Sequence, residues 1–568
     1  MSQETQKLVT VTIDERQVQV PPGTTIIQAG ERLGVEIPHY CYHPGLPIEG
    51  VCRMCLVEVE KSPKLLIACA TPVAEGMVVH TRTPHVEEVR RGVLEFYLLN
   101  HPLDCPVCDK GGECPLQDYT MRYGPGASRT IEPKVHRDKH RPIGPHVIFD
   151  AERCILCTRC VRFCRDVVGT GELGIGFRGD RAEIILFPGR DLDNPYSGNV
   201  IDLCPVGALT STEYRFRSRP WDLVRHVEST CPACSRGCSI VMDVRHLRTG
   251  GEEVLRIRPR HNPEVNGYWM CDEGRFEAYP RRGRSALQSP LVRRDDAHVS
   301  VEWDEAVAVL AERLRGICDR HGPASVGGLL STWLTTEELY AASTFLREVL
   351  GTPHLDYRVH PVQELAADEA EDHLLRRTDK SPNTRGARAL GLGPGPGGWG
   401  TREMLEAARS GRLKALLLFE EEPWEEAVFA DEWERSLDRL ELLVMWAVRG
   451  PVGTRRADLV FPALGYAEKE GTIVNFAGRI QRVRKAIEPK GKVLPLGEVL
   501  HRVAVGLRGS GIPWTPEEIW RRLATESAAF RGIEYETIGP LGVPLTTGDQ
   551  GFQGSRVEGM KGSSVMGG

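Results

Sequence analysis

The sequence predicts a multidomain protein that combines α+β and α/β architecture, and three observations indicate this. The chain has 568 residues, more than the roughly 250–300 residues that a single hydrophobic core usually reaches. Sixteen of its 17 cysteines lie before residue 272, and only Cys318 lies beyond. The back half instead alternates buried strand patterns with helical patterns, as α/β domains do. We therefore expect a cysteine-rich front half and a back half with a separate role.

Composition and charge narrow the class of protein. A hydrophobic content of 41% and a charged content of 26% are typical of a globular protein. The formal net charge of −6 and the pI near 6.3 provide no basic field for a nucleic acid. We expect no membrane span and no secretory signal, because no long apolar run is present. In a cytosolic chain, 17 cysteines indicate metal or redox chemistry rather than disulfides.

The first cysteine group follows a β-rich opening. LVTVTI and RQVQV alternate as strands do, and TTIIQAGERLG has a helical pattern. A close pair of cysteines with one distant partner on each side resembles the arrangement of plant-type ferredoxins. This spacing favours a two-iron cluster, with structural zinc as the alternative. The four candidate ligands are Cys41, Cys52, Cys55 and Cys69.

The second group lies in HPLDCPVCDKGGEC, residues 101–114, and includes a histidine. Three thiolates and one imidazole make an ordinary tetrahedral zinc site. The same set can hold an iron–sulfur cluster, in which an imidazole ligand changes the reduction potential. Taken by itself, the stretch favours zinc over a cluster, because zinc sites are commoner. The candidate ligands are His101, Cys105, Cys108 and Cys114.

The third group begins with CILCTRCVRFC, a run typical of bacterial ferredoxins, and ends with CPVGA. In two-cluster ferredoxins the fourth cysteine of such a run, here Cys164, serves the other cluster. Residues 165–203 contain no second run, so we interpret Cys164 as an unligated packing residue. The candidate ligands of one four-iron cluster are Cys154, Cys157, Cys160 and Cys204.

The fourth group lies in CPACSRGC and WMC, and its spacing suits either zinc or a four-iron cluster. Fifteen cysteines and one histidine then make four complete sets. Four zinc sites would be an odd use of a ferredoxin-type run, whereas four clusters would form a path for electrons. We therefore interpret all four sets as iron–sulfur sites. The last set consists of Cys231, Cys234, Cys238 and Cys271.

The remaining candidates near these motifs have simpler interpretations. Cys318 lies in the helical pattern WDEAVAVLAERLRGICDRHG, where we expect it on the buried face. Arg53, Arg159 and Arg162 stand beside ligands and either raise cluster potentials through their charge or serve as solvated surface residues.

The four motifs in this order resemble the large iron–sulfur subunit of respiratory complex I, the G-subunit family of bacterial NADH:quinone oxidoreductases. The resemblance covers about residues 1–505 and is most specific in the front half. In the back half, SPLVRRD…VSVEWDEAVAVL and AEKEGTIVNFAGRIQ resemble molybdopterin oxidoreductases.

The resemblance implies six segments along the chain. The first is a β-grasp 2Fe-2S ferredoxin domain, and a small His(Cys)3 4Fe-4S domain follows it. A ferredoxin-like 4Fe-4S domain and a 4Fe-4S domain of the molybdopterin-oxidoreductase type come next. A degenerate molybdopterin-oxidoreductase-like domain and a partly disordered C-terminal extension complete the chain. The expected bounds are 1–85, 86–125, 145–220, 224–280, 281–510 and 511–568.

The resemblance also implies the function. The chain would relay electrons from a flavin subunit through its two-iron cluster, the third set and then the histidine-ligated set, towards quinone. The fourth cluster would lie off this path. The chain would hold one 2Fe-2S and three 4Fe-4S clusters, without molybdopterin and without a complete active site of its own. The alternatives are the iron–sulfur/molybdopterin subunit of an NAD-linked formate dehydrogenase and a zinc-stabilised scaffold.

The expected partners follow from the same resemblance. They are the flavin- and NADH-binding subunit with its 2Fe-2S partner, a ferredoxin-like subunit on the quinone side, and other peripheral-arm subunits of complex I. The chain would be cytoplasmic and would lie on the cytoplasmic face of the inner membrane through the complex.

The back half can be tested on physical grounds. SVGGLL, KALLLF and ELLVMWAV read as buried parallel strands, and ligands of such sheets bind beyond the carboxyl ends of the strands. Directly after KALLLF come Glu420, Glu421 and Glu422, then Glu425 and Glu426, which would repel the pyrophosphate of a pterin.

Three further stretches lack regular patterns. We interpret GLGPGPGGWG at 391–400 as a loop, residues 124–146 as a basic connector, and the glycine- and serine-rich stretch from about 545 as disordered.

Overall fold

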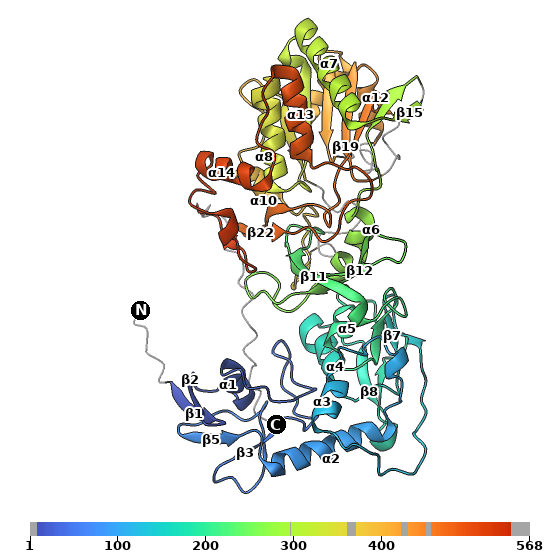
Figure 1. Cartoon of the computed structure of the whole chain (residues 1–568), viewed down its shortest axis with the longest axis vertical. Coiled ribbons are helices and arrows are strands. Elements are labelled where there is room, and N and C mark those ends of the chain that lie inside the picture. Colours follow the sequence, from blue (N-terminus) through green and yellow to red (C-terminus); the bar gives the residue numbers. More distant parts are fainter. Residues whose placement is uncertain (1–7, 296, 360–370, 422–429, 450–455, 547–568) are drawn as a thin grey trace. The chain divides into compact units, whose positions relative to one another are not determined.

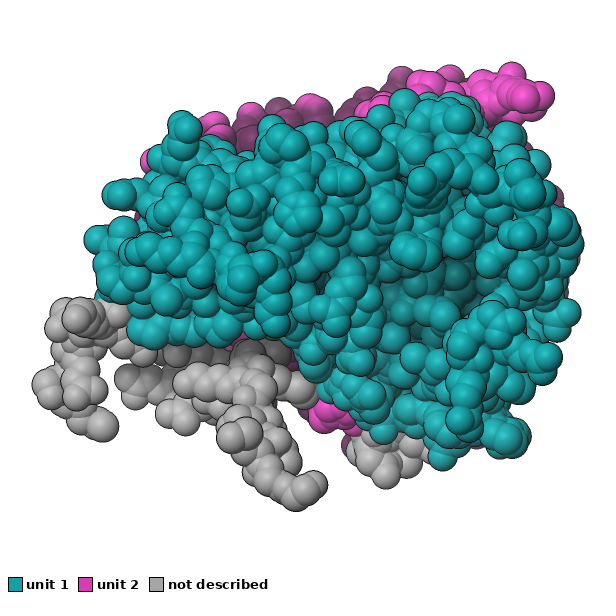
Figure 2. Space-filling view, turned by 90° about the horizontal axis from the view of Figure 1, so that it is seen from below, with its two compact units in different colours: residues 1–223, 560–568 teal, residues 224–559 magenta. Residues whose placement is uncertain are grey.

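The computed structural model describes residues 8–295, 297–359, 371–421, 430–449 and 456–546 (Figure 1). The chain divides into two compact units, which Figure 2 draws in different colours. Unit 1 runs from Met1 to Leu223, and unit 2 runs from Val224 to Gly559. Unit 1 contains the first three candidate ligand sets, and unit 2 contains the fourth.

Unit 1 opens with a mixed five-stranded sheet in the order β2-β1-β5-β3-β4. The hairpin of β1 and β2 is antiparallel, while β1 pairs in parallel with β5 from the far end of the domain. One helix, α1, packs with the sheet into a single apolar cluster. The elements are β1 (Val9–Ile13), β2 (Arg16–Val20), α1 (Ile26–Arg32), β3 (Leu56–Val59), β4 (Leu66–Ile67) and β5 (Met77–His80).

The sequence explains where α1 begins and which face it buries. Thr25 is its N-cap, and the Thr25 amide donates to the Gln28 side chain at 3.0 Å in a capping box. Ile26, Ile27 and Ala29 are buried. They join Val11 and Ile13 of β1 in the core, so the alternation of β1 and the period of α1 meet on one apolar face.

Two helices frame the histidine-containing motif. Helix α2 (Pro84–Asn100) begins with proline at its first position, behind Thr83, whose hydroxyl accepts from the Val86 amide at 3.2 Å. It ends immediately before His101. A 3-10 turn, η1 (Cys105–Val107), and helix α3 (Pro115–Tyr123) follow, and Cys114 is the N-cap residue of α3.

The third part of unit 1 is built from short elements around long loops. A three-stranded sheet has the order β10-β7-β6, and β8 and β9 form a separate hairpin. Helix α4 continues directly into the π-helical turn η2. The elements are β6 (Arg141–Pro142), β7 (Val147–Phe149), α4 (Arg159–Arg162), η2 (Phe163–Val168), β8 (Leu173–Gly176), β9 (Glu183–Leu186), α5 (Asn199–Leu203) and β10 (Leu209–Ser211).

Unit 2 begins with a small three-stranded sheet in the order β11-β12-β13. Strands β12 and β13 are antiparallel, and a π-helical turn and a short helix follow them. The elements are β11 (Leu223–Thr230), β12 (Ser239–His246), β13 (Glu252–Pro259), η5 (Glu273–Glu277) and α6 (Ala278–Arg282).

The centre of unit 2 is a seven-stranded sheet in the order β15-β14-β20-β19-β18-β16-β17. Five strands, β17, β16, β18, β19 and β20, are parallel neighbours, and the β14–β15 hairpin adds an antiparallel edge. The strands are β14 (Leu291–Arg294), β15 (Ala297–Ser300), β16 (Val326–Ser331), β17 (Leu355–Arg358), β18 (Ala415–Phe419), β19 (Leu442–Ala447) and β20 (Leu459–Pro462).

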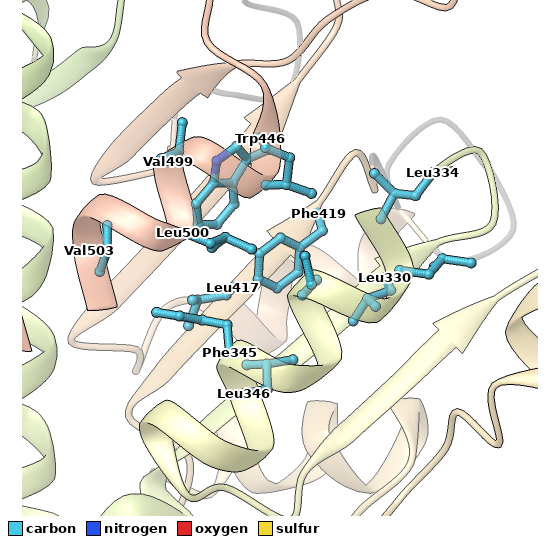
Figure 3. Close-up of a cluster of buried hydrophobic side chains, with 14 of the residues drawn as sticks. Leu330, Leu334, Phe345, Leu346, Leu417, Phe419, Trp446, Val499, Leu500 and Val503 are labelled. Atoms are coloured by element: carbon cyan, nitrogen blue, oxygen red, sulfur yellow. The ribbon is translucent and has the colours of Figure 1, made fainter. Parts of the chain in front are cut away.

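Helices cover both faces of this sheet. Leu417 and Phe419 of β18 belong to one apolar cluster, whereas Leu416 and Leu418 belong to a second cluster on the opposite face. Figure 3 shows Leu417, Phe419 and Trp446 packed against residues of η7 and α13. The helices are α7 (Trp303–His321), α8 (Thr336–Thr344), η7 (Phe345–Leu350), α10 (Thr384–Ala389), α11 (Thr401–Arg409), α12 (Ala430–Leu437), α13 (Leu496–Arg508) and α14 (Pro516–Glu526).

A last three-stranded sheet has the order β21-β22-β23, made of β21 (Gly471–Val474), β22 (Arg479–Val483) and β23 (Val543–Pro544). Every helix in the described part of the chain is too short or too polar to cross a bilayer.

Most expectations about local structure are confirmed. The patterns LVTVTI, RQVQV, SVGGLL, KALLLF and ELLVMWAV form strands, the last three of them as parallel neighbours. Residues 391–400 form a loop. Cys318 is half-buried on α7, where it packs against the large apolar cluster. The glycine- and serine-rich tail from residue 547 lies outside the described residues.

Candidate metal centres

The first ligand set is brought together at one end of the five-stranded sheet. Cys52 and Cys55 lie in the loop before β3, and Cys69 follows β4. The Cys41 thiol shares hydrogen bonds with those of Cys52 and Cys69, and the Cys55 thiol shares one with Cys69. The Tyr40 amide also donates to Cys52 Sγ at 3.4 Å. All four thiols therefore meet in one buried place.

These contacts explain the shifted pKa values of the four thiols. Accepting hydrogen bonds from Cys52 and Cys69 lowers the pKa of Cys41, and accepting one from Cys69 lowers the pKa of Cys55. The pKa values of Cys52 and Cys69 are raised, mainly because each donates to Cys41. Such sharing of protons shows how closely the four sulfurs approach one another.

In the second set, His101 is positioned by the end of α2. The Lys134 ammonium donates to the Leu98 and Leu99 carbonyls at 2.7 and 3.0 Å, and the Val135 amide donates to the Asn100 side chain at 3.0 Å. The connector thus caps the last turn of the helix. Burial, helped by the charges of Arg153 and Lys134, lowers the pKa of His101 to about 4. The imidazole is therefore neutral at pH 7, as a metal ligand must be.

The three thiols of this set lie on the following loop. Cys108 and Cys114 are buried, and Cys105 is exposed. Burial raises the pKa of Cys114 to about 11 and raises that of Cys108. The Cys108 amide donates to the Cys105 carbonyl at 3.4 Å, so these two residues lie in one turn. Placing His101 as their fourth partner stays a prediction.

The second set abuts the loop that carries Cys204 of the third set. Cys114 Sγ lies 3.7 Å from the Pro205 carbonyl oxygen. A Cβ atom on Gly207 would lie 2.0 Å from Cys108 Sγ, so any side chain there would displace the sulfur. The loop can hold this position only because residue 207 is glycine.

The third set surrounds a small cavity. Cys154, Cys157, Cys160 and Cys204 all line it, together with apolar side chains such as Ile184. The Leu156 amide donates to Cys154 Sγ at 3.4 Å. Leu156 and Thr158, on either side of Cys157, have φ angles of 52° and 61°, an uncommon conformation for residues other than glycine. Burial raises the pKa values of Cys154, Cys157 and Cys160, to about 11 for Cys157.

Cys164 lies apart from this cavity, in a small polar cluster. It is fully buried and shares hydrogen bonds with Glu172 and Asn194. The Glu172 carboxylate accepts from Asn194 at 3.0 Å and from the Thr170 hydroxyl at 2.6 Å. Burial and the Glu172 charge raise the pKa of the thiol. These polar side chains occupy the surroundings of Cys164, which supports its interpretation as a packing residue.

Two arginines of α4 join the first and third sets. The Arg162 guanidinium is buried and donates to the Cys41 carbonyl at 2.6 Å and to the Cys157 carbonyl at 3.2 Å. Arg159 donates to the Tyr42 and Leu203 carbonyls. The surface interpretation of Arg162 is therefore wrong, because its guanidinium is needed to bond buried loop carbonyls. Arg53 is exposed.

The fourth set lies in unit 2, at the end of the small sheet. Cys231, Cys234, Cys238 and Cys271 are all buried, and burial raises the pKa of each. The Gly274 amide donates to Cys271 Sγ at 3.4 Å, and a Cβ at this glycine would lie 2.8 Å from Cys231 Sγ. Glycine again allows backbone to approach two ligands closely.

Across the described residues, no three His, Cys, Asp or Glu side chains converge tightly enough to enclose a single metal ion.

Five models of known protein families match the chain. Two of them describe iron–sulfur regions of NADH-ubiquinone oxidoreductase, and one describes a ferredoxin-like domain of NADH-quinone oxidoreductase subunit 3. They are a 2Fe-2S iron-sulfur cluster binding domain (6–84), the NADH-ubiquinone oxidoreductase-G iron-sulfur binding region (90–129), the ferredoxin-like domain (144–210), the NDSU1/NuoG-like 4Fe-4S domain (224–279) and molybdopterin oxidoreductase (287–380 and 383–502).

Curated relatives decide the family. The NADH-quinone oxidoreductase G subunit of Rickettsia bellii is 32% identical over 93% of this chain and 90% of its own length. The chain belongs to the family of NADH-quinone oxidoreductase G subunits. The G subunit of Streptomyces coelicolor is 36% identical over 93% of this chain and 62% of its own length. The NADH-ubiquinone oxidoreductase 75 kDa subunit of Reclinomonas americana is 41% identical over 66% and 52%, respectively.

Membership in the G-subunit family confirms several expectations. The chain is an electron-transfer subunit of the iron–sulfur class, with 2Fe-2S and 4Fe-4S domains followed by a molybdopterin-oxidoreductase fold. The matched domains favour iron–sulfur over zinc, and nothing in the comparisons specifically supports the formate dehydrogenase alternative. The domain bounds and the sixteen ligand assignments stay predictions.

Sequence reasoning missed Gly207, Lys134 and Arg153. Gly207 stands in the CPVGA motif three residues after Cys204, and Arg153 stands directly before Cys154. Their neighbours across the loops, Cys108 and Asp104, are far away in sequence. The sequence shows that Arg153 and Gly207 lie near ligands of the third set. It does not show that both contact the second set.

Proposed function

We propose that this chain transfers electrons inside an NADH:quinone oxidoreductase, from the NADH-oxidising side towards quinone, with one 2Fe-2S and three 4Fe-4S clusters held by the sixteen residues. The observation that carries this proposal is the continuity of the three ligand sets in unit 1. Arg162 donates hydrogen bonds to loop carbonyls of the first and third sets. Gly207, in the loop after Cys204, packs against Cys108 of the second set.

The donor sets fit the proposed clusters. Backbone amides donate to ligand sulfurs at 3.4 Å in three of the sets, from Tyr40, Leu156 and Gly274, and such hydrogen bonds tune cluster potentials. Burial raises the pKa of Cys160 in the third set and of Cys238 in the fourth, so bare thiolates are costly at these positions. Positively charged iron relieves this cost when it binds.

When bound, the clusters supply one-electron carriers. The residues of the chain hold them in place, keep water away and bring neighbouring sites together. The first set borders the third through Arg162, and the third borders the second through Pro205 and Gly207. This neighbour order supports the sequence of transfer that the family resemblance implies, which ends at the histidine-containing set. Cys105 in that last set is exposed, which suits an exit towards another subunit.

The partners that we propose have matching roles. A flavin- and NADH-binding subunit with its 2Fe-2S partner would deliver electrons near the first set, and a ferredoxin-like subunit on the quinone side would receive them. Other peripheral-arm subunits would hold the chain on the cytoplasmic face of the inner membrane. The names of the relatives, which are subunits of NADH-quinone or NADH-ubiquinone oxidoreductases, support this placement.

We propose further that the back domain binds no molybdopterin, because its own side chains occupy the place where phosphates bind in such sheets. Helix α8 follows β16, and its first turn carries Glu337 and Glu338. Glu338 and Glu420, which follows β18, both bond to the buried Lys469 ammonium, at 3.1 and 2.6 Å. A pterin pyrophosphate would have to break this buried ion pair.

The glutamates after β18 act differently from the expectation drawn from sequence. The sequence predicts a nest of repelling carboxylates, but Glu420 pairs with Lys469, and Glu421 pairs with Arg358 at 2.9 Å. The physical reason is that a buried carboxylate needs a cation nearby. Glu422, Glu425 and Glu426 lie outside the described residues.

Metal analysis of the full chain, purified without oxygen, tests the proposal. One 2Fe-2S and three 4Fe-4S clusters require about 14 iron atoms per chain, with an equal amount of acid-labile sulfide. EPR of the reduced protein should show both cluster types, and molybdenum and tungsten should be absent. Stoichiometric zinc with little iron would contradict the proposal, and a bound pterin would contradict the interpretation of the back domain.

A further inference from the structure

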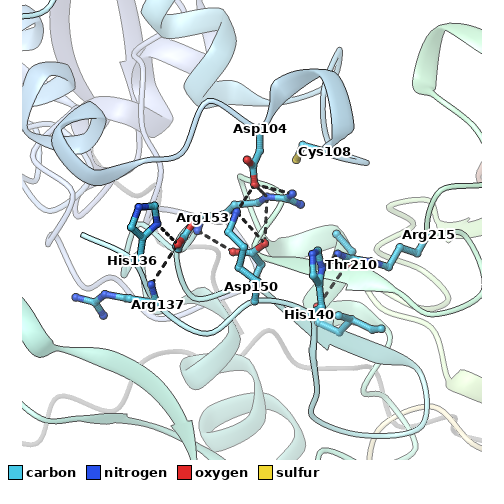
Figure 4. Close-up of polar contacts among 12 residues, drawn as sticks. Asp104, Cys108, His136, Arg137, His140, Asp150, Arg153, Thr210 and Arg215 are labelled. Atoms are coloured by element: carbon cyan, nitrogen blue, oxygen red, sulfur yellow. Dashed lines mark hydrogen bonds and ion pairs between the residues drawn. The ribbon is translucent and has the colours of Figure 1, made fainter. Parts of the chain in front are cut away.

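Arg153 is a buried charge directly beside a ligand of the third set. Its side chain is 2% exposed. The guanidinium donates to Asp104 Oδ2 through Nε at 2.9 Å and through Nη2 at 2.8 Å, and Nε lies 3.3 Å from Asp150 Oδ2 (Figure 4). Two carboxylates therefore fix the charge in one orientation.

The side chain of Arg153 reaches the loop of the second set. Asp104, whose Oδ2 atom accepts from two nitrogens of Arg153, directly precedes Cys105. The position of a Cβ on Gly207 would lie 2.0 Å from Cys108 Sγ and 3.7 Å from Arg153 Cδ. Cys108 and Arg153 therefore pack against the same glycine, and the guanidinium belongs spatially to the second set.

Different arginines act on the two sets. Among the charged groups, Arg153 has the largest effect on Cys108 and on His101. Arg137, which Figure 4 also labels, acts on Cys154, and Arg159 acts on Cys157. The third set thus has its own cations, although Arg153 is the one adjacent to it in sequence.

The charged network around Arg153 has one net negative charge, because Asp104, Asp150 and Glu152 face two cations, Arg153 and Lys139. Lys139 lies 2.6 Å from Asp104 and 2.8 Å from Glu152, so it adds a second cation to the same network. Removing Arg153 alone would leave Asp104 and Asp150 with only the Lys139 ammonium, 4.0 Å from Asp150. The second set would then face excess negative charge in a place of low dielectric constant.

We propose that Arg153 is a positioning residue that the loop of the third set supplies to the second set, where its charge raises the reduction potential of the histidine-containing site. This inference rests on the proposed function, because it requires a cluster at that site. An added electron meets less repulsion next to a fixed guanidinium. The single loop between residues 150 and 154 therefore contributes both a ligand to one site and a controlling charge to its neighbour.

The test is EPR-monitored redox titration of the full chain, purified without oxygen, with the variants Arg153→Gln and Arg137→Gln compared with the unchanged protein. The signal of the second set is identified as the one that His101→Cys alters. Arg153→Gln should shift the reduction equilibrium of that signal about tenfold towards the oxidised form, which is about 59 mV for one electron. The third-set signal should move much less, and Arg137→Gln should show the opposite preference.

Two further variants separate charge from structure. Arg153→Lys keeps the charge and should restore most of the potential. Asp150→Asn removes a buried negative charge beside Arg153, so it should shift the second-set equilibrium towards the reduced form. A purely structural ion pair would not produce shifts of opposite sign.

The possible outcomes are distinct. Full iron content with an unmoved second-set potential in Arg153→Gln would overturn the inference but leave the proposed function standing. If Arg153→Gln loses iron, Asp150→Asn decides, and an unmoved second-set potential in that variant would also overturn the inference. Absence of any cluster from the unchanged chain would instead contradict the proposed function itself.

Discussion

In unit 1 the amides of Tyr40 and Leu156 each donate to a ligand sulfur at 3.4 Å, whereas at the strand ends of unit 2 the buried ionic groups bond to one another. Lys469 forms ion pairs with Glu420 and Glu338, and Arg358 forms one with Glu421. Unit 1 thus directs donors towards a cofactor, and the sheet of unit 2 satisfies its own polar groups. Internal ion pairs can therefore satisfy the buried polar groups at the strand ends of a sheet.

The two regions also differ in what holds them together. The sheet of unit 2 has apolar clusters on both faces, with Phe419 and Trp446 stacked at 4.6 Å between ring centroids. The ligand loops of unit 1 rely instead on single polar bonds, such as those of Arg162, and on close backbone approach at Gly207. We expect cofactor loss to affect the loops of unit 1 and to leave the sheet of unit 2 folded.

The largest effect should come from Gly207→Ala. The new Cβ would lie 2.0 Å from Cys108 Sγ, 3.4 Å from Lys110 Cβ and 3.7 Å from Arg153 Cδ. We expect loss of the second cluster, about four iron atoms per chain, measured by iron analysis and EPR. Gly92→Ala in α2 is the matched control, because nothing lies within 4 Å of its Cβ position. Full iron content in Gly207→Ala would show that the two sets are not in close contact.

A large effect on unit 2 should come from Lys469→Met. Removing the ammonium leaves Glu420 and Glu338 unpaired in a buried place, at a cost of about 3–5 kcal/mol. Thermal unfolding should therefore occur at a lower temperature, while the iron content stays unchanged. The control is Lys492→Met, whose ion pair with Glu302 is exposed and contributes about 0–1 kcal/mol. Equal effects of the two variants would show that the Lys469 pairs do not stabilise the sheet.

The next effect concerns the ligand type at position 101. A neutral imidazole gives the site one negative charge less than a fourth thiolate, so His101→Cys should keep four irons and lower the potential. One unit charge about 5 Å away at a dielectric constant near 20 contributes roughly 3 kcal/mol. This energy corresponds to about 140 mV for a one-electron couple. An unmoved potential with an unchanged EPR spectrum would show that His101 is not a ligand.

The smallest effect should come from Cys164→Ser. The thiol already shares hydrogen bonds with Glu172 and Asn194, and a serine hydroxyl can make the same contacts. We expect unchanged iron content and a change in the free energy of unfolding below about 1 kcal/mol. Loss of about four iron atoms would instead assign Cys164 to a cluster.

The sequence predicted the fold well where local patterns and burial agree. Alternation marked β1 and β2, and the apolar runs marked β16, β18 and β19, since strands buried on both faces have no polar side. The cysteine spacing indicated the four sets, because ligands of one site are held by short loops. The status of Glu420 was misjudged, since its partner Lys469 lies 49 residues away in the chain.

What the sequence determined by itself is the inventory: sixteen candidate ligands in four spaced motifs, a histidine in one of them, and an α/β back domain. Spacing within a motif is a local property, so it can be read without a structure. Only the tertiary structure decided which motifs are neighbours. It shows that Gly207 packs against Cys108 and that Arg153 bonds to Asp104 of the second-set loop. These contacts join residues 49 to 99 positions apart, and their energies depend on burial that no local pattern encodes.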